Sequence, residues 1–352
     1  TLEGGRGGTV TSSGHAAETL ALFPLMVPGM EVIVADKLYG GTINLMGKSY
    51  RKFGWNAVFV DTDNPEAFRK AVTEKTRAIF IENLANPGGV VVDLEAIAKV
   101  ADEAGVPLVV DNTMATPFLC QPFEWGADLV VHSTTKFLSE QGNAVGGVVI
   151  DSGKFPWLGN SKFPSLSTPS PEYNGLTFAE TFGDLAYTMY SHAISLRDLG
   201  CTQSPMNAWI TLNGIETLPL RMERHCSNGL AVAKFLEKQA NVEWVSHAGL
   251  ESSQYFELGK KYLPEGTGSV FTFGVKGGYE SGLKMLESVE LFSHVANIGD
   301  TRSLILHPAS TTHRQLTEEQ RIAAGAGPEV IRLSIGIECV EDIISDLDQD
   351  LN

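Results

Sequence analysis

The chain has 352 residues, a length that suits two domains better than one. Hydrophobic residues make up 43% of it, which is enough for a buried core, and the formal net charge is −16. A surface that is so acidic argues against nucleic acid and against anionic membranes as partners.

The cysteines and the apolar runs indicate the cellular compartment and argue against a metal site and a membrane span. None of the four cysteines forms a Cys-x-x-Cys pair or has zinc spacing, so we expect a reducing compartment and no metal site. The most apolar stretch, residues 21–35, is interrupted by prolines, a glycine and a glutamate and cannot span a bilayer. No signal peptide is visible, and a cytoplasmic protein is the expectation, although a chain that starts at Thr1 leaves targeting open.

The first half of the chain alternates β-rich runs with helical patterns. The clearest helix is Asp93–Ala104, with Asp93 as its N-cap and Gly105 at the stop position. This alternation predicts an α/β fold with a mostly parallel sheet covered by helices on both faces. Ligands of such folds bind at the carboxyl ends of the strands. The expected strands are Glu31–Ala35, Ala57–Val60, Arg77–Glu82, Pro107–Asp111, Asp128–His132 and Val145–Ile150.

The amino-acid composition changes after residue 150. Residues 151–187 are rich in proline, glycine, serine and aromatics, which predicts a long loop with little secondary structure. Helical segments follow, and then a smaller α+β region. We therefore expect a large domain over residues 1–225 and a C-terminal α+β domain over 226–352. The strands expected in the second region are Val242–Val245, Ser269–Val275, Ser303–Leu306 and Val330–Ile335, before a last helix over Val340–Leu351.

A lysine follows the predicted strand Asp128–His132, directly after hydroxyl side chains, in the sequence Ser133-Thr134-Thr135-Lys136. Its next two neighbours are apolar, so we expect its amine to be partly removed from water. Desolvation lowers the pKa of a lysine and makes it a nucleophile or an imine former. The alternative is a turn at the strand end whose lysine reaches out to solvent.

Three further features fall at the same predicted sheet edge. Asp111 ends a strand, where it could pair with a pyridinium nitrogen or simply cap a turn. Residues Ser12–Ala17 predict a turn of small residues at the start of a helix, and the backbone N–H groups of such helix starts bind phosphate. Tyr39, beside two glycines, could stack on a flat cofactor or be an ordinary turn residue. A lysine, an acid, a phosphate turn and a stacking ring are together what a pyridoxal phosphate (PLP) enzyme needs.

The order of these motifs along the chain resembles the Cys/Met-metabolism family of fold-type I PLP-dependent enzymes. The resemblance covers nearly the whole chain, from Leu2-Glu3-Gly4-Gly5 to the end of the last predicted strand. It is carried by Ser12–Ala17, Tyr39–Thr42, Glu82 with Asn86-Pro87, Val110–Pro117, Gly126-Ala127-Asp128, His132–Lys136, His307–His313 and Ile331–Glu338.

The resemblance implies a role for each matching residue. Lys136 would carry PLP as a Schiff base, Asp111 would pair with the pyridine nitrogen, and Tyr39 would stack on the ring and assist proton transfer. Arg332 would bind the substrate α-carboxylate, which suits a guanidinium. The remaining cofactor residues would be Gly14, His15, Thr113, Ser133 and Thr135, and the carboxylate site would include Asn86 and Ser303.

Several segments resemble the O-acetylhomoserine sulfhydrylase branch of this family, among them the insert after Ile150 and Phe292–Asp300. This implies γ-replacement on O-acetyl-L-homoserine by sulfide or a small thiol, giving homocysteine or methionine plus acetate. The alternatives are a γ-lyase or a cystathionine γ-synthase, and more remotely a PLP-binding protein without catalysis. Gly41 weakens the γ-lyase interpretation, because methionine γ-lyases typically place a cysteine there. The family also implies a homo-oligomer, a dimer of dimers with shared active sites.

The chain departs from the family in two places. Family members often carry Gly-His-Gly a few residues after the lysine, whereas this chain reads Ser139-Glu140-Gln141-Gly142-Asn143, so we expect a different loop geometry. The family segment that precedes Leu-Glu-Gly-Gly, including a Tyr-x-Arg that reaches a neighbouring subunit's phosphate, is absent from this sequence. A protein that truly lacked this segment would be expected to bind PLP poorly.

Overall fold

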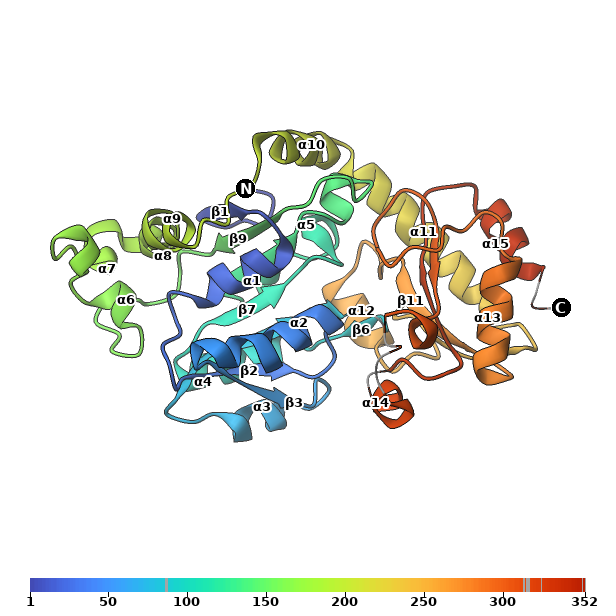
Figure 1. Ribbon diagram of the computed structural model, residues 1–352, viewed down its shortest axis with the longest axis horizontal. Coiled ribbons are helices and arrows are strands. Elements are labelled where there is room, and N and C mark those ends of the chain that lie inside the picture. The colour runs from blue at the N-terminus through green and yellow to red at the C-terminus, as the bar shows by residue number, and fades with distance from the viewer. Residues whose placement is uncertain (86–87, 313, 315–316, 324, 350, 352) are drawn as a thin grey trace. The chain divides into compact units, whose positions relative to one another are not determined.

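The computed structural model describes residues 1–85, 88–312, 314, 317–323, 325–349 and 351 (Figure 1). The chain forms two compact units. The first unit comprises Thr1–Asn83, Val92–Thr135 and Ala144–Thr211, and the second comprises Leu84–Val91, Lys136–Asn143 and Leu212–Asn352. Among the described helices, none combines the length and apolar character that a membrane crossing requires.

The first unit is built on a seven-stranded sheet in the order β1-β9-β8-β7-β4-β2-β3. The five strands from β8 to β3 are parallel, and β9 and β1 add an antiparallel edge. All six predicted strands of this sheet form, within two residues of the expected bounds. The strands are β1 (Gly7–Thr11), β2 (Glu31–Ala35), β3 (Asn56–Val60), β4 (Thr76–Glu82), β7 (Leu108–Asp111), β8 (Leu129–Ser133) and β9 (Gly147–Asp151).

Strand β1 is absent from the sequence prediction. Its sequence, Gly-Gly-Thr-Val-Thr, has too few apolar residues to show a pattern of period two. The strand forms because β9 offers it an antiparallel partner, with Gly7 opposite Asp151 and Thr11 opposite Gly147. The pairing that forms this strand therefore joins residues about 140 positions apart. Local propensity cannot reveal a strand of this kind.

Helices connect and cover the sheet, and α1 crosses in front of it in Figure 1. The predicted helix forms as α4, whose N-cap Asp93 accepts a hydrogen bond from the Ala96 amide (3.3 Å) and which ends at Gly105 with φ of 61°. The expected start at Ser12–Ala17 is also confirmed, because Ser13 caps α1. The helices are α1 (Gly14–Leu22), α2 (Gly40–Asn44), α3 (Pro65–Ala71), α4 (Leu94–Ala104), α5 (Thr116–Leu119), α6 (Pro164–Ser167), α7 (Phe178–Phe182), α8 (Ala186–Tyr190), α9 (Arg197–Leu199) and α10 (Pro205–Glu216).

The segment over residues 151–187 contains only short helices, as expected for a long loop, but it carries an aromatic cluster of its own. Trp157 stacks on Tyr187 with ring centroids 5.6 Å apart, and Phe163 meets Trp157 edge-on at 5.2 Å. All three side chains are buried. Burial of large aromatic surfaces stabilises the loop without regular secondary structure.

The second unit is centred on an antiparallel sheet in the order β10-β11-β13-β12. Its core is formed by apolar side chains of these strands and of helices α11, α13 and α15. The four strands predicted for this region are confirmed. The elements are β5 (Leu84–Ala85), β6 (Val90–Val91), β10 (Val242–Ser246), β11 (Val270–Val275), β12 (Leu304–Leu306), β13 (Val330–Ser334), α11 (Leu218–Leu236), α12 (Phe256–Tyr262), α13 (Gly278–Ser288), α14 (Glu318–Ala323) and α15 (Val340–Asp348).

The fold class is therefore the expected one, with a mostly parallel sheet flanked by helices and a smaller unit with an antiparallel sheet. Helix α11 runs without interruption through residues 225 and 226. The division of the chain into domains at that position stays a prediction.

Candidate active site

The carboxyl edge of the first unit's sheet gathers polar side chains. Strand β4 ends at Glu82, β7 at Asp111 and β8 at Ser133, and these three strands are neighbours. Glu82 and Asp111 are register partners across the parallel pair. The parallel topology thus places at one edge the acid and the hydroxyl that the sequence singles out, where ligands of such sheets bind.

Asp111 lies in a strongly desolvated position at this edge. Its carboxylate accepts a hydrogen bond from the backbone N–H of Thr113 at 2.8 Å. Burial raises the pKa of Asp111 above its ordinary value of 3.8, and the hydrogen bonds from Thr113 and the histidines His132 and His15 oppose that rise. A buried acid that is costly to ionise alone becomes easy to ionise beside a cation. Asp111 therefore fits a protonated pyridine nitrogen.

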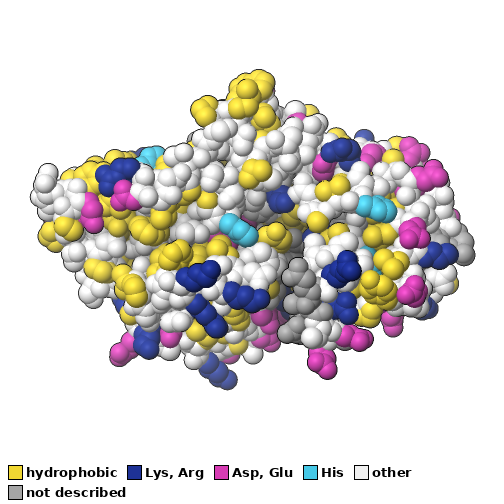
Figure 2. All heavy atoms as spheres, viewed as in Figure 1, with side chains coloured by type: hydrophobic (Ala, Val, Ile, Leu, Met, Phe, Trp, Pro, Cys, Tyr) yellow, Lys and Arg dark blue, Asp and Glu magenta, His cyan; other side chains and the backbone are white. Residues whose placement is uncertain are grey.

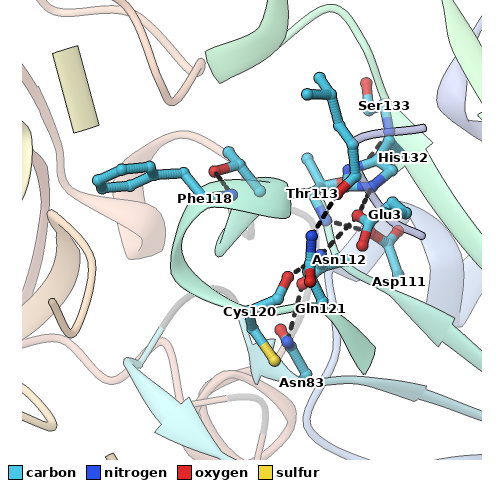
Figure 3. Close-up of polar contacts among 12 residues, drawn as sticks. Glu3, Asn83, Asp111, Asn112, Thr113, Phe118, Cys120, Gln121, His132 and Ser133 are labelled. Atoms are coloured by element: carbon cyan, nitrogen blue, oxygen red, sulfur yellow. Dashed lines mark hydrogen bonds and ion pairs between the residues drawn. The ribbon is translucent and has the colours of Figure 1, made fainter. Parts of the chain in front are cut away.

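A buried polar network lies beside Asp111 (Figure 3). The Glu3 carboxylate accepts a hydrogen bond from the Asn112 side chain at 2.8 Å, and the same oxygen lies 2.5 Å from Nε2 of His132. Asn112 also accepts a hydrogen bond from the Asn83 amide at 2.8 Å and donates to the Cys120 carbonyl at 2.9 Å. Because all of these groups are buried, each bond replaces water that the site excludes.

This network was not predicted as functional from the sequence, although it ties together the ends of β7 and β8. Its members Glu3 and His132 are 129 residues apart. The signal in the sequence is a polar residue at an unexpected place: His132 follows the apolar residues of β8, one position before the strand ends, and is 1% exposed. A buried histidine must find a partner, but the sequence alone does not say that the partner is Glu3.

The start of α1 packs directly against the end of β8. A Cβ atom on Gly14 would lie 2.7 Å from the Cβ of Ser133, and one on Gly147 would lie 2.2 Å from the carbonyl oxygen of Ser13. Only glycine permits these approaches. The backbone amides at a helix start and the hydroxyl of Ser133 form a donor set that suits a phosphate.

The two threonines expected at the cofactor have backbone partners in the structure. The hydroxyl of Thr113 accepts a hydrogen bond from the Ser133 amide at 2.8 Å, so it fixes the β8 end. The hydroxyl of Thr135 donates to the carbonyl of Gly146 at 3.2 Å and accepts from its amide at 3.1 Å. A direct role of either hydroxyl on the phosphate stays a prediction.

Tyr39 precedes helix α2 and is 48% exposed. Its backbone N–H donates to Glu82 at 2.7 Å, which anchors it to the sheet edge. Its ring centroid lies 5.9 Å from that of His15 on α1. Tyr39 thus has an anchored backbone and a side chain that is accessible to a ligand, which is what a stacking residue needs.

In the second unit, Lys136 is half-buried and its amine donates a hydrogen bond to Oδ1 of Asn297 at 2.5 Å. The backbone carbonyl of Asn297 in turn accepts a hydrogen bond from the Arg332 guanidinium at 3.1 Å. Burial lowers the pKa of Lys136 from 10.5 to about 8, and the positive charge of Arg332 adds to this effect. The desolvated lysine expected from the sequence is therefore what the fold provides. Asn297 was missed as a site residue, although it lies within the segment Phe292–Asp300.

This shift leads to a prediction for the cofactor-free protein. We expect the Lys136 amine to be half neutral near pH 8, whereas a solvated lysine reaches that point near 10.5. Since only the neutral amine reacts with acylating reagents, Lys136 should become reactive as the pH rises through 8, before the surface lysines. Competitive acetylation followed by mass spectrometry measures this midpoint. A midpoint above 10 would contradict the desolvation of the amine.

The residues expected at the substrate carboxylate have different surroundings. Arg332 lies on β13, with the contact to Asn297 described above. Ser303 is buried, and its hydroxyl donates to Glu338 at 3.0 Å and accepts from the Gly336 amide at 2.9 Å. Asn86 lies outside the described residues. A direct contact of Ser303 or Asn86 with the substrate stays a prediction.

Comparison with known proteins places this arrangement in a family. The O-acetyl-L-homoserine sulfhydrylase of Leptospira meyeri is 48% identical over 359 residues, covering 99% of this chain and 81% of that protein. The homocysteine synthase of Schizosaccharomyces pombe is 45% identical, covering 99% of this chain and 82% of that protein. The family model described as Cys/Met metabolism PLP-dependent enzyme matches residues 1–352.

A solved structure supports the same assignment. The crystal structure of a Campylobacter jejuni protein assigned as an O-acetylhomoserine (thiol)-lyase, which contains N'-pyridoxyl-lysine-5'-monophosphate, matches with a TM-score of 0.95. The two chains are 38% identical, and the match covers 99% of this chain and 83% of that one. This chain belongs to the Cys/Met metabolism family of PLP-dependent enzymes.

Proposed function

We propose that the protein catalyses γ-replacement on O-acetyl-L-homoserine with sulfide or a small thiol, releasing acetate and homocysteine or methionine. A new C–S bond forms at Cγ, and the Cγ–O bond to acetate breaks. The observation that carries the proposal is the half-buried Lys136 amine, which donates to the side chain of Asn297 while Arg332 donates to the backbone carbonyl of the same residue. The names of the similar proteins, sulfhydrylase and homocysteine synthase, support the same reaction.

The residues divide the work of the reaction between them. PLP, when bound, withdraws electrons from the substrate α-carbon and so stabilises the charge left when a proton departs. Lys136 removes that proton, because its lowered pKa keeps a large neutral fraction near pH 8. Asp111 holds a proton at the pyridine nitrogen, and Arg332 orients the substrate through its carboxylate. The α1 start and Ser133 would bind the phosphate, and Tyr39 would cover the ring.

The reaction can be tested with purified protein, PLP, O-acetyl-L-homoserine and sulfide. We expect homocysteine and acetate in equal amounts, and a change in the cofactor absorbance when the substrate is added. Formation of 2-oxobutyrate and ammonia in place of homocysteine would show a γ-lyase. Homocysteine formation from O-succinylhomoserine alone would identify a different leaving group, and methanethiol in place of sulfide tests the thiol donor.

Gly41 supports replacement over elimination. A Cβ atom there would lie 2.3 Å from Cε1 of Tyr39 and 2.8 Å from Nε2 of His15. A cysteine at this position, as methionine γ-lyases typically have, would therefore require a different place for the Tyr39 ring. The local packing of this chain accommodates glycine.

The same contact yields a prediction for Gly41→Ala. The added methyl group should displace the Tyr39 ring and weaken PLP binding by about tenfold, the size expected for overpacking at one contact. Equilibrium titration with PLP measures the change. The control is the same substitution in a Tyr39→Ala background, where the effect should vanish because the ring is gone. An effect that persists there would show that Gly41 acts elsewhere.

We further propose that the protein works as a homo-oligomer in the cytoplasm. Helix α10 supports the first part, because its side chains Met206, Trp209 and Leu212 are each more than 60% exposed. Figure 2 shows hydrophobic side chains gathered at the top of the view, where Figure 1 places α10. Exposed apolar patches of this kind mark protein–protein contacts.

A further inference from the structure

The turn that follows Lys136 has a strained backbone. Glu140 has φ of 73° and ψ of −51°, a conformation that glycine adopts readily and other residues avoid. The Gln141 amide donates a hydrogen bond to the Ser139 carbonyl at 2.9 Å across it. This is a γ-turn with positive φ, which is rare and strained. It falls within the segment where the chain departs from the Gly-His-Gly of similar family members.

The Glu140 side chain is held by a buried guanidinium. Arg221 on α11, whose side chain is 6% exposed, places Nε 3.3 Å from the Glu140 carboxylate, and Thr217 donates a hydrogen bond to the same oxygen. Nε donates its hydrogen bond to the Thr217 hydroxyl at 3.0 Å, and the other two guanidinium nitrogens donate to the carbonyls of Phe137 (2.8 Å) and Gly214 (2.6 Å). Arg221 therefore binds both the backbone and the side chain of the segment that follows Lys136. A buried guanidinium needs a carboxylate, and Glu140 supplies it.

The other side of the turn contacts the segment that holds the Lys136 amine. The Thr301 amide donates to the Glu140 carbonyl at 3.1 Å. A Cβ atom on Gly299 would lie 2.7 Å from the Phe137 amide nitrogen, so the two backbones touch. This second segment begins at Asn297, the hydrogen-bond partner of Lys136. The turn thus lies between α11 and the residues that fix the amine.

We propose that Glu140 is a positioning residue for Lys136: its carboxylate, bound by Arg221 and Thr217, maintains the strained turn that sets Lys136 against Asn297. The inference rests on the proposed role of Lys136 as the reacting amine. The ion pair between the buried guanidinium and the partly exposed Glu140 carboxylate offsets strain in the backbone, an arrangement typical of functional sites. Glycine would remove the strain together with the carboxylate, whereas alanine would remove the carboxylate and keep the strain.

The difference between the glycine and alanine variants can be tested experimentally. We expect Glu140→Ala to raise the acetylation midpoint of Lys136 in the cofactor-free protein by about one pH unit toward that of a solvated lysine. In the PLP-loaded enzyme the same variant should lower kcat about tenfold with little change in KM, because a misplaced base affects the chemical step. Glu140→Gly should show a smaller change in both quantities. Glu140→Gln, which keeps the side chain and loses the charge, replaces the alanine variant should that one fail to fold.

The matched control is Glu223→Ala, an exposed glutamate on the same helix as Arg221, which should leave both quantities unchanged. Wild-type midpoints and kcat in the Glu140 variants, with only a lower thermal midpoint, would overturn the proposal. So would a Glu140→Gly variant as impaired as Glu140→Ala. If the wild type fails to convert O-acetylhomoserine but the Lys136 midpoint moves as expected, the proposed function fails and the positioning role stands.

Discussion

Lys136→Ala should lower the turnover of O-acetyl-L-homoserine by about a thousandfold or more, since a general base alone contributes up to 10⁴-fold. The structure gives the reason: the amine is half-buried, desolvation lowers its pKa to about 8, and it donates a hydrogen bond to Asn297. The variant should also lose the absorbance of a lysine-bound cofactor. Steady-state assays and an absorbance spectrum measure both effects.

The control for this variant is Lys99→Ala, which removes an exposed lysine of α4. It should behave like the unmodified protein in both measurements. Borohydride reduction of the PLP-loaded enzyme, followed by peptide mapping, should find the cofactor on Lys136. Cofactor on another lysine, or full activity of Lys136→Ala, would end the proposed mechanism.

Asp111→Asn should reduce kcat on the order of 10²- to 10³-fold, as expected when one preorganised electrostatic group is removed. Burial makes the Asp111 carboxylate costly to ionise by itself, so a pyridinium partner and the carboxylate stabilise each other. An amide of the same shape cannot hold the ring proton. The measurement is kcat together with the cofactor spectrum, which reports the protonation of the ring.

Asp128, which lies beside the same sheet, provides a matched control for Asp111. Asp128 precedes β8 and accepts a hydrogen bond from the Leu108 amide at 2.9 Å, and burial raises its pKa to about 7. It lies at the amino end of the parallel strands, away from the edge where ligands bind. Asp128→Asn should therefore leave kcat unchanged. Equal losses in the two variants would mean that Asp111 matters only for folding.

Much of the fold could be predicted from the sequence, because local signals and tertiary structure agree there. The helix that Asp93 caps and Gly105 ends formed as expected, and so did the strands rich in β-branched residues. The strand β1 could not be predicted, since its glycines and threonines become a strand only against β9. Local propensity predicts an element where its own residues carry the pattern, and fails where a distant partner supplies it.

The candidate site divides in the same way. Asp111 could be predicted because it ends an apolar strand, and Lys136 because it follows another apolar strand directly after its hydroxyl residues. Asn297 could not, because the contact that gives it a role joins residues 161 positions apart. Glu140 could be recognised only as a departure from similar sequences. The role of Glu140 depends on a backbone angle and on its contact with Arg221, neither of which can be seen in the sequence.

The hydrogen bonds of Asn297 connect the carboxylate site at Arg332 to the amine of Lys136. One residue joins the Lys136 amine to the Arg332 guanidinium, and the positive charge of Arg332 lowers the pKa of Lys136. A substrate carboxylate bound to Arg332 would neutralise that charge and allow the pKa to rise. The affinity of Lys136 for a proton and the occupation of the carboxylate site are thereby linked thermodynamically, and each strengthens the other. Occupation of the carboxylate site would then make Lys136 a stronger base.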